Sequence, residues 1–149
     1  MRGKVRIFTM GFTKKSAERF FGLLEGAGVK RVIDIRLYNV SQLAGFSKKG
    51  DLTFFLKRFG MGYVHEPLLS PTPSMYHRLI REHGSWAVYE RQFLKLMKER
   101  KIETAIAPDV VHEGSLLCSE ETPEHCHRRL VAEYLQRAWG RGVEIVHLV

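Results

Sequence analysis

Several residues that can do chemistry occur close together in the last third of the chain. Cys118 and Glu120 end a short apolar run, and Cys126, His127 and Arg128 follow shortly afterwards. A thiolate is a nucleophile and a metal ligand, carboxylates and imidazoles transfer protons, and a guanidinium binds phosphate through its planar fork. The residue types therefore allow nucleophilic, acid–base, redox or metal chemistry, and the sequence leaves these alternatives open.

A second group of candidates follows two other apolar runs. Gly11 closes the run 5–10, whereas Asp34 and Arg36 come at the end of the β-branched run 31–35. Because Asp34 and Arg36 are two positions apart, their side chains can point to the same side of an extended chain. Ligands of open α/β sheets bind beyond the carboxyl ends of the strands. We therefore predict one site at that edge, with the catalytic candidates Asp34, Glu120, Cys126 and His127 and the ligand-binding candidates Gly11, Arg36, Cys118 and Arg128.

Most of these residues also have an ordinary structural interpretation. Cys118 lies in an apolar run, and buried cysteine often only fills space. Asp34 can be the ion-pair partner of Arg36, and His127 can simply donate to a backbone carbonyl. Cys126 is harder to explain by packing, because it stands at a predicted helix start, where the pKa of a thiol falls.

Spacing argues against several familiar chemistries. The Cys-x5-Arg loop of a cysteine phosphatase is absent, because positions 124 and 132 are Glu and Ala. No Gly-x4-Gly-Lys-Ser/Thr loop occurs, and no Gly-x-Gly-x-x-Gly motif follows a strand. Cys118 and Cys126 lack the Cys-x2-Cys spacing of a structural zinc site, so the spacing assigns no metal ligand. We expect the two cysteines to lie close together as free thiols, with a disulfide as the alternative.

Length and composition are those of a single globular domain. The chain has 149 residues, of which 44% are hydrophobic, so we expect one domain over 1–149. Its formal net charge of +8 allows a nucleic acid or a phosphate-bearing small molecule as partner, but a solvated basic surface is the simpler interpretation of the same charge. No apolar run is long enough for a membrane span, and Met1-Arg2-Gly3-Lys4 leads directly into a strand-like run. We therefore expect a cytoplasmic protein with no membrane partner; the sequence does not identify a cofactor.

The predicted elements alternate between strands and helices. Thr13 or Ser16 can cap a first helix, Asp51 a second, and Thr122 with Pro123 the last one. Such alternation predicts a single-domain three-layer α/β sandwich, with a mostly parallel sheet and helices on both faces. The expected strands are 5–10, 31–35, 63–65, 115–118 and 143–148, and two further helices are expected over 75–82 and Trp86–Arg100.

Taken together, the motifs resemble the family called domain of unknown function 488, over nearly the whole chain. This family implies a compact α/β domain without an established activity, and its motif positions correspond to the eight candidates above. The chain departs from the family pattern at Phe12, where His is usual, and the loop after Arg36 keeps only part of the usual Pro- and Arg-rich pattern. The resemblance rests on Ile7-Phe8-Thr9-Met10-Gly11, Val32-Ile33-Asp34-Ile35-Arg36, Leu117-Cys118-Ser119-Glu120, Pro123-Glu124-His125-Cys126-His127-Arg128 and Val143-Glu144-Ile145-Val146-His147.

Three functional hypotheses follow from these residues. The first is an enzyme that acts on a phosphate-bearing substrate, either a nucleotide or a nucleic acid. Arg36 and Arg128 would hold the phosphate, Asp34 or Glu120 would be the general base, and His127 would relay a proton. The second is a non-catalytic module that binds a nucleic acid or another anionic ligand in the same pocket. The third is a redox or metal site formed by the two cysteines with His127.

Overall fold

Five parallel strands form a sheet at the centre of the protein. The structure is a computed structural model that describes residues 4–39, 45–120 and 122–149. The strands are β1 (Val5–Gly11), β2 (Arg31–Asp34), β3 (Gly62–His65), β4 (Gly114–Cys118) and β5 (Val143–Leu148), in the sheet order β3-β2-β4-β1-β5. The longer helices are α1 (Ala17–Ala27), α2 (Lys49–Arg58), α3 (Pro73–Ile80), α4 (Trp86–Arg100) and α7 (His127–Trp139). Shorter turns are α5 (Ile102–Ala105), α6 (Pro108–Val111), η1 (Gly45–Ser47) and η2 (Pro67–Leu69).

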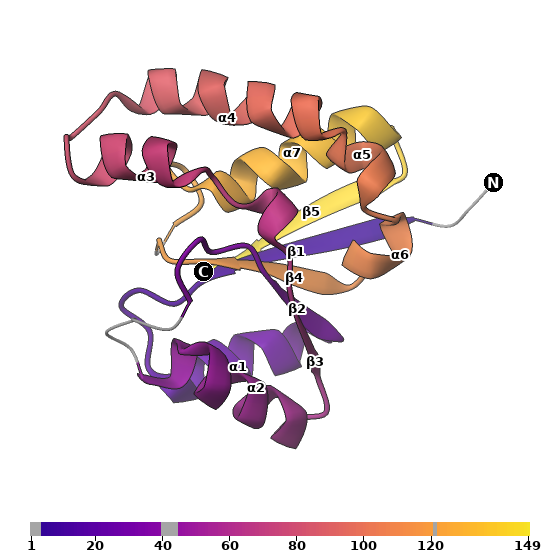
Figure 1. The fold of residues 1–149 in the computed structure, drawn as a ribbon. Helices are drawn as coiled ribbons and strands as arrows, with labels where there is room; N and C mark the ends of the chain where they lie inside the picture. The colour runs from indigo at the N-terminus through magenta and orange to yellow at the C-terminus, as the bar shows by residue number, and fades with distance from the viewer. Residues whose placement is uncertain (1–3, 40–44, 121) are drawn as a thin grey trace.

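Helices cover both faces of the sheet, as Figure 1 shows: α1 and α2 lie against one face, and α3 to α7 lie over the other. All four strand pairs are parallel. A parallel sheet is covered on both sides because its crossover connections are helical. The structure therefore confirms the predicted α/β sandwich, and the sheet is entirely parallel among the described residues.

The alternation of side chains along each strand divides the core into two parts. Ile7 and Leu116 pack into the larger core beneath α4 and α7, whereas their neighbours Phe8 and Leu117 pack into the smaller core against α1 and α2. Successive residues of a strand point to opposite faces of the sheet, so every strand end offers side chains to both layers. Because of this alternation, candidate residues at the same edge of the sheet can lie on opposite faces of it.

Some predicted helix ends are confirmed and others are wrong. The helix expected over 75–82 is α3 (Pro73–Ile80), which begins and ends two residues earlier, because Thr72 caps it. Ser16 accepts a hydrogen bond from the backbone N–H of Arg19 and caps α1, and α4 spans the expected Trp86–Arg100. Asp51 is not a cap, because α2 already begins at Lys49 and Asp51 lies in its first turn.

The last helix also starts later than expected. It begins at His127 with Cys126 as its N-cap, so Thr122 and Pro123 do not open it. The N–H of Cys126 donates instead to the carbonyl of Pro123, at 3.3 Å, and closes a turn ahead of the helix. Ser, Thr and Pro favour turns for the same reasons that they favour helix starts, so the local pattern alone does not separate the two. The later start leaves Cys126 and His127 at the first turn of the helix.

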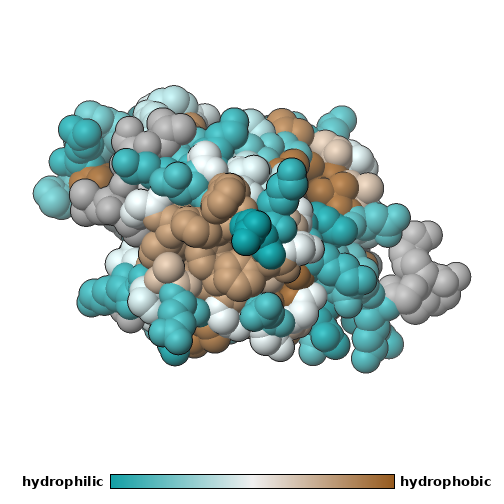
Figure 2. Space-filling view, turned by 90° about the horizontal axis from the view of Figure 1, so that it is seen from below, coloured by the Kyte–Doolittle hydropathy of each residue, from teal (hydrophilic) through white to brown (hydrophobic). Residues whose placement is uncertain are grey.

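One outer surface is markedly apolar. Phe54, Phe55 and Phe59 of the α2 segment are 59%, 37% and 41% exposed. Figure 2, which views the molecule from below, shows a large hydrophobic area bordered by hydrophilic residues. Among the described residues, no helix is long and apolar enough to span a membrane.

We predict that Phe93→Ala lowers the free energy of unfolding by about 3–5 kcal/mol, because a fully buried aromatic ring leaves a cavity in the larger core. The matched control is Phe54→Ala, which removes a ring that is 59% exposed and should change stability by no more than about 0.5 kcal/mol. Urea denaturation followed by circular dichroism measures both. Equal losses for the two variants would contradict the assignment of Phe93 to the core.

Candidate functional site

The eight predicted site residues lie at the carboxyl edge of the sheet but divide between its two faces. Gly11 and Cys118 end neighbouring strands and face one another in register, and Asp34 pairs in register with Leu117. Cys118 belongs to the larger core. Asp34 follows Val32 of the smaller core by two positions and therefore points to the α1 and α2 side. The sequence-based prediction that the candidates share this edge is confirmed, and the division between faces is an addition from the structure.

Asp34 and Arg36 form a buried bidentate ion pair on the α1 and α2 side. Arg36 donates from Nε to Oδ1 and from Nη2 to Oδ2 of Asp34, both at 2.8 Å, and its side chain is only 2% exposed. Tyr63 donates its hydroxyl proton to the same carboxylate at 2.6 Å, and the Asn39 amide lies at 3.4 Å. The guanidinium also lies over the ring of Phe12, 5.5 Å from its centroid. The carboxylate is therefore fully engaged with neighbouring donors.

The same contacts determine the protonation state of Asp34. Burial by itself raises the pKa of this carboxyl, but the hydrogen bonds and charge of Arg36 and the hydrogen bond from Tyr63 outweigh it, so the pKa lies below its usual value. Asp34 is thus held as the anion. Burial and the neighbouring Asp34 carboxylate raise the pKa of Tyr63, which keeps its proton.

Arg128 fastens the loop after β4 to the end of β1. Its side chain is completely buried; Nη1 donates to the carbonyl of Glu120 at 2.7 Å, and Nε reaches the Thr9 hydroxyl at 3.4 Å. Gly11 makes this contact possible, since an added Cβ would lie 1.6 Å from the Glu120 carbonyl oxygen and 2.8 Å from Nη1 of Arg128. Gly11 is therefore required by close approach of the backbone, and Arg128 positions the segment that carries Glu120.

Cys118, Cys126 and His127 gather on the α4 and α7 side of the edge. The Nε2 atom of His127 lies 2.8 Å from the carbonyl oxygen of Ile35, and its Nδ1 atom lies 3.2 Å from Sγ of Cys118. A carbonyl oxygen only accepts, so Nε2 carries the proton and donates it. Sγ of both cysteines and a ring nitrogen of His127 lie within 4.8 Å of one another. Both cysteines are free thiols, which confirms the sequence-based expectation.

The two thiols do not ionise alike. Burial and the neighbouring Cys126 raise the pKa of Cys118 well above its usual range. Burial also opposes ionisation of Cys126, but the hydrogen bond from Cys118, the neighbouring His127 and the positive charge of Arg128 hold its pKa well below the usual range. Cys126 is moreover the N-cap of α7, where the helix dipole favours an anion. The pair therefore carries its first negative charge on Cys126.

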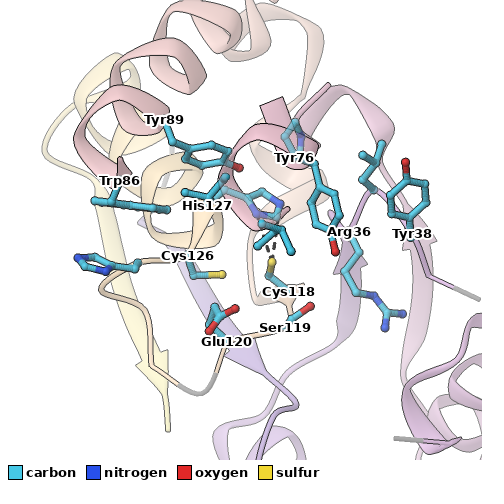
Figure 3. Close-up of a pocket in the computed structure, with 15 residues that line it drawn as sticks. Arg36, Tyr38, Tyr76, Trp86, Tyr89, Cys118, Ser119, Glu120, Cys126 and His127 are labelled. Carbon is cyan, nitrogen blue, oxygen red and sulfur yellow. Dashed lines mark hydrogen bonds between the residues drawn. The ribbon is translucent and has the colours of Figure 1, made fainter. Parts of the chain in front are cut away.

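A cavity of about 290 Å³ opens beside these sulfur atoms. Figure 3 shows the rings of Trp86, Tyr89 and Tyr76 arranged around it from left to right, with the sulfur atoms of Cys118 and Cys126 below them in the view. Arg36 is also a lining residue, but its guanidinium points away from the sulfur atoms. The remaining lining residues are Leu37, Tyr38, Pro71, Leu79, Ile80, Ser119, Glu120, His125 and His127. Asp34, Gly11 and Arg128 do not line this cavity, and the predicted roles of all eight residues stay predictions.

Glu120 is the carboxylate that lines the cavity among the residues that the structure describes. It reaches solvent at the edge of the site, yet partial burial and the nearby Cys126 raise its pKa, while Arg128 and His125 act in the opposite direction. A carboxyl with a raised pKa can exchange protons closer to neutral pH than an ordinary surface glutamate.

The rings of Tyr76, Trp86 and Tyr89 form what we call the aromatic wall of the cavity. None of these residues was among the site residues predicted from the sequence. Trp86 stacks between Tyr89 and His125, with ring centroids 5.1 and 5.0 Å apart. Tyr76 comes from α3 and contacts the ring of Tyr38 edge-on. The spacing of Trp86 and Tyr89 within one helix indicates a shared face, but nothing local indicates that this face meets the end of β4.

Comparison of the chain with models of known protein families agrees with the resemblance of its motifs. The family model described as domain of unknown function DUF488 matches residues 16–135. The chain therefore belongs to the DUF488 family, whose description states no activity. No curated protein and no solved structure matches the chain significantly.

We predict that Asp34→Asn costs about 3–5 kcal/mol of stability, because it leaves the buried guanidinium of Arg36 without its counter-charge. The wild-type contribution is complete above the unfolded-state pKa of about 3.9 and is lost as the pH falls through the lower folded-state pKa. As the pH falls, the free energy of unfolding of the variant should therefore decrease less than that of the wild type. Urea denaturation across acidic and neutral pH measures this. The control is Glu144→Gln, which breaks a surface pair with Arg6 and should cost at most about 1 kcal/mol.

We further predict that Gly11→Ala is strongly destabilising, because the new methyl group collides with the backbone carbonyl of Glu120. Gly22→Ala is the matched control: it lies within α1, its added Cβ meets nothing within 4 Å, and it should gain up to about 1 kcal/mol. Thermal denaturation of both variants provides the comparison. A tolerated Gly11→Ala substitution would contradict the close approach of β1 to the Glu120 carbonyl.

Proposed function

We propose that this protein is an enzyme that acts on a nucleotide or a nucleic acid, with the base entering the cavity at the carboxyl edge of the sheet. The observation that carries the proposal is the cavity itself. It combines an aromatic wall from α3 and α4 with a floor of thiol, imidazole and carboxylate groups from β4 and the start of α7. Aromatic stacking holds a planar ring, and the opposite floor presents reactive groups to it.

The size and chemistry of the cavity suit a heterocycle. Its volume of about 290 Å³ is near the lower end of ligand pockets, which run from roughly 300 to 1,000 Å³. The rings of Tyr76, Trp86 and Tyr89 offer flat apolar surfaces. Stacking on such rings is worth about 1–3 kcal/mol per base. A base whose sugar and phosphate remain outside fits these dimensions better than a large flexible ligand.

Arg36 is our candidate for the phosphate contact. Two of its nitrogen atoms bind Asp34, but Nη1 is buried without a hydrogen-bond partner among the residues that the structure describes. A buried unpaired donor costs free energy, so an anion that reaches Nη1 would gain a charge-assisted hydrogen bond. The formal net charge of +8 also favours an anionic partner.

Glu120 is our candidate for the general acid–base, in preference to Asp34. Glu120 lines the cavity and has a raised pKa, whereas Asp34 is fully buried and already accepts hydrogen bonds from Arg36 and Tyr63. A general base must approach the proton that it removes, and only Glu120 of these two carboxylates can approach a ligand in this cavity.

The first test is binding. Calorimetric titration at low salt with inorganic phosphate, the common mononucleotides and a short single-stranded oligonucleotide should show affinity for at least one base-bearing ligand. We expect Tyr76→Ala to weaken that affinity about tenfold or more, the loss of one stacking contact. The surface variant Phe54→Ala should bind normally, because its ring lies on the opposite layer of the molecule. Absence of binding by every ligand would refute the proposal.

The second test is turnover, followed by mass spectrometry of the ligands that bind. Glu120→Gln keeps the shape of the side chain but cannot transfer a proton, so we expect turnover to fall by about 10²–10⁴-fold while affinity is retained. The increase of kcat/KM with pH on the acid side should also disappear. The control Glu124→Gln removes the same charge from an exposed residue of the same loop. Binding without any turnover would instead identify a non-catalytic nucleotide-binding module.

A further inference from the structure

The two cysteines and the histidine at the floor of the cavity have the arrangement of metal ligands. We propose that Cys118, Cys126 and His127 bind one Zn²⁺ ion, whose fourth coordination position opens into the cavity. The potential ligand atoms of all three residues lie within 4.8 Å of one another. This inference concerns metal binding alone and does not depend on the substrate proposed above.

The hydrogen bond to Ile35 prepares His127 as a ligand. Because Nε2 donates its proton to that carbonyl at 2.8 Å, Nδ1 carries a lone pair, and Nδ1 is the atom that lies 3.2 Å from Sγ of Cys118. Histidine ligands of metals almost always donate their other ring N–H to a carbonyl or carboxylate, which holds the tautomer and the ring orientation. The outer hydrogen bond that such a site needs is therefore in place.

The distances require only small side-chain movements. Zn–S bonds of about 2.3 Å and Zn–N bonds of about 2.0–2.1 Å place tetrahedral ligand atoms roughly 3.6–3.8 Å apart. The Cys118 sulfur and His127 Nδ1 are 3.2 Å apart, and the whole group lies within 4.8 Å. These separations differ from the tetrahedral values by about 1 Å or less.

The charges also balance. Two thiolates and one Zn²⁺ ion form a neutral group, because each thiol releases its proton to solvent when its sulfur binds the metal. Neutrality matters at this position, since Cys118 and Cys126 are 7% and 2% exposed and an isolated charge there would be costly. Thiolate ligands select zinc over the harder cations that carboxylates prefer.

The open position distinguishes this site from a structural zinc site. Structural sites are closed by four protein ligands, whereas a Cys2His set with one vacant position is typical of catalytic zinc. All three residues line the cavity, and Glu120 and Ser119 lie beside them. The vacant position therefore faces the space in which a water molecule or a ligand would bind.

The first experiment uses the wild-type protein, purified under reducing conditions, stripped of metal and titrated with Zn²⁺ against a chromophoric chelator. We expect one Zn²⁺ per chain, confirmed by native mass spectrometry. Replacement by Co²⁺ should produce thiolate-to-cobalt charge-transfer bands and the intense visible bands of tetrahedral cobalt. A cobalt spectrum without thiolate bands, or no competition with the chelator, overturns the proposal. So does the finding that the reduced protein reoxidises to a Cys118–Cys126 disulfide in the presence of excess Zn²⁺.

Variants identify the ligands. Cys118→Ser, Cys126→Ser and His127→Gln should each weaken Zn²⁺ binding by more than about 100-fold, beyond the 10–100-fold typical of outer-shell changes. The matched control is His125→Gln, which alters an adjacent exposed histidine that stacks on Trp86. It should bind Zn²⁺ like the wild type. Circular dichroism shows whether each variant is folded. If a variant is not folded, the cobalt spectrum of the wild-type protein still shows whether thiolates bind the metal. Equal affinity of a folded Cys126→Ser or Cys118→Ser protein would show that the sulfur atoms are not ligands.

Discussion

The hydrogen bond between the His127 ring and the Ile35 carbonyl joins parts of the chain that are far apart in sequence. It ties the first residue of α7 to the end of β2, across the end of β4. Through it the imidazole is held over Cys118, and Phe93 of α4 supports the ring from the side. The floor of the cavity, and any metal or proton chemistry at it, depends on this one contact, because it determines which ring nitrogen faces the sulfur atoms.

Arg128 stabilises the same region from the other direction. Its guanidinium is completely buried, and among the residues that the structure describes it binds a backbone carbonyl and a hydroxyl rather than a carboxylate. The loop that carries Glu120 is therefore attached to the end of β1 through its backbone, and the Glu120 side chain remains available to the cavity. Position 11 requires glycine because the backbone carbonyl of Glu120 in this loop lies where a Cβ atom would be.

The division of the sheet edge into two faces separates polar residues that are close in space. Asp34 and Arg36 neutralise one another beside Tyr63 and Phe12, and Asp34 points away from the cavity. The thiols, the imidazole and Glu120 lie on the opposite face. Each face thus has its own electrostatic environment. A buried ion pair lies on one side, and the thiols and Glu120, whose pKa values are shifted, lie beside the imidazole on the other.

Local sequence determined the secondary structure and the edge at which the site lies. Alternating apolar runs and caps such as Ser16 predict strands and helices because those patterns act over a few residues, and parallel strands necessarily bring their carboxyl ends together. Gly11, Asp34, Cys118 and His127 could be assigned to that edge for this reason. The tertiary structure alone decided which of them meet. Strand order brings Ile35 to His127, side-chain alternation sends Asp34 to the opposite face from Cys118, and the packing of α3 and α4 supplies the aromatic wall. These contacts join residues far apart in the chain, and no local pattern encodes them.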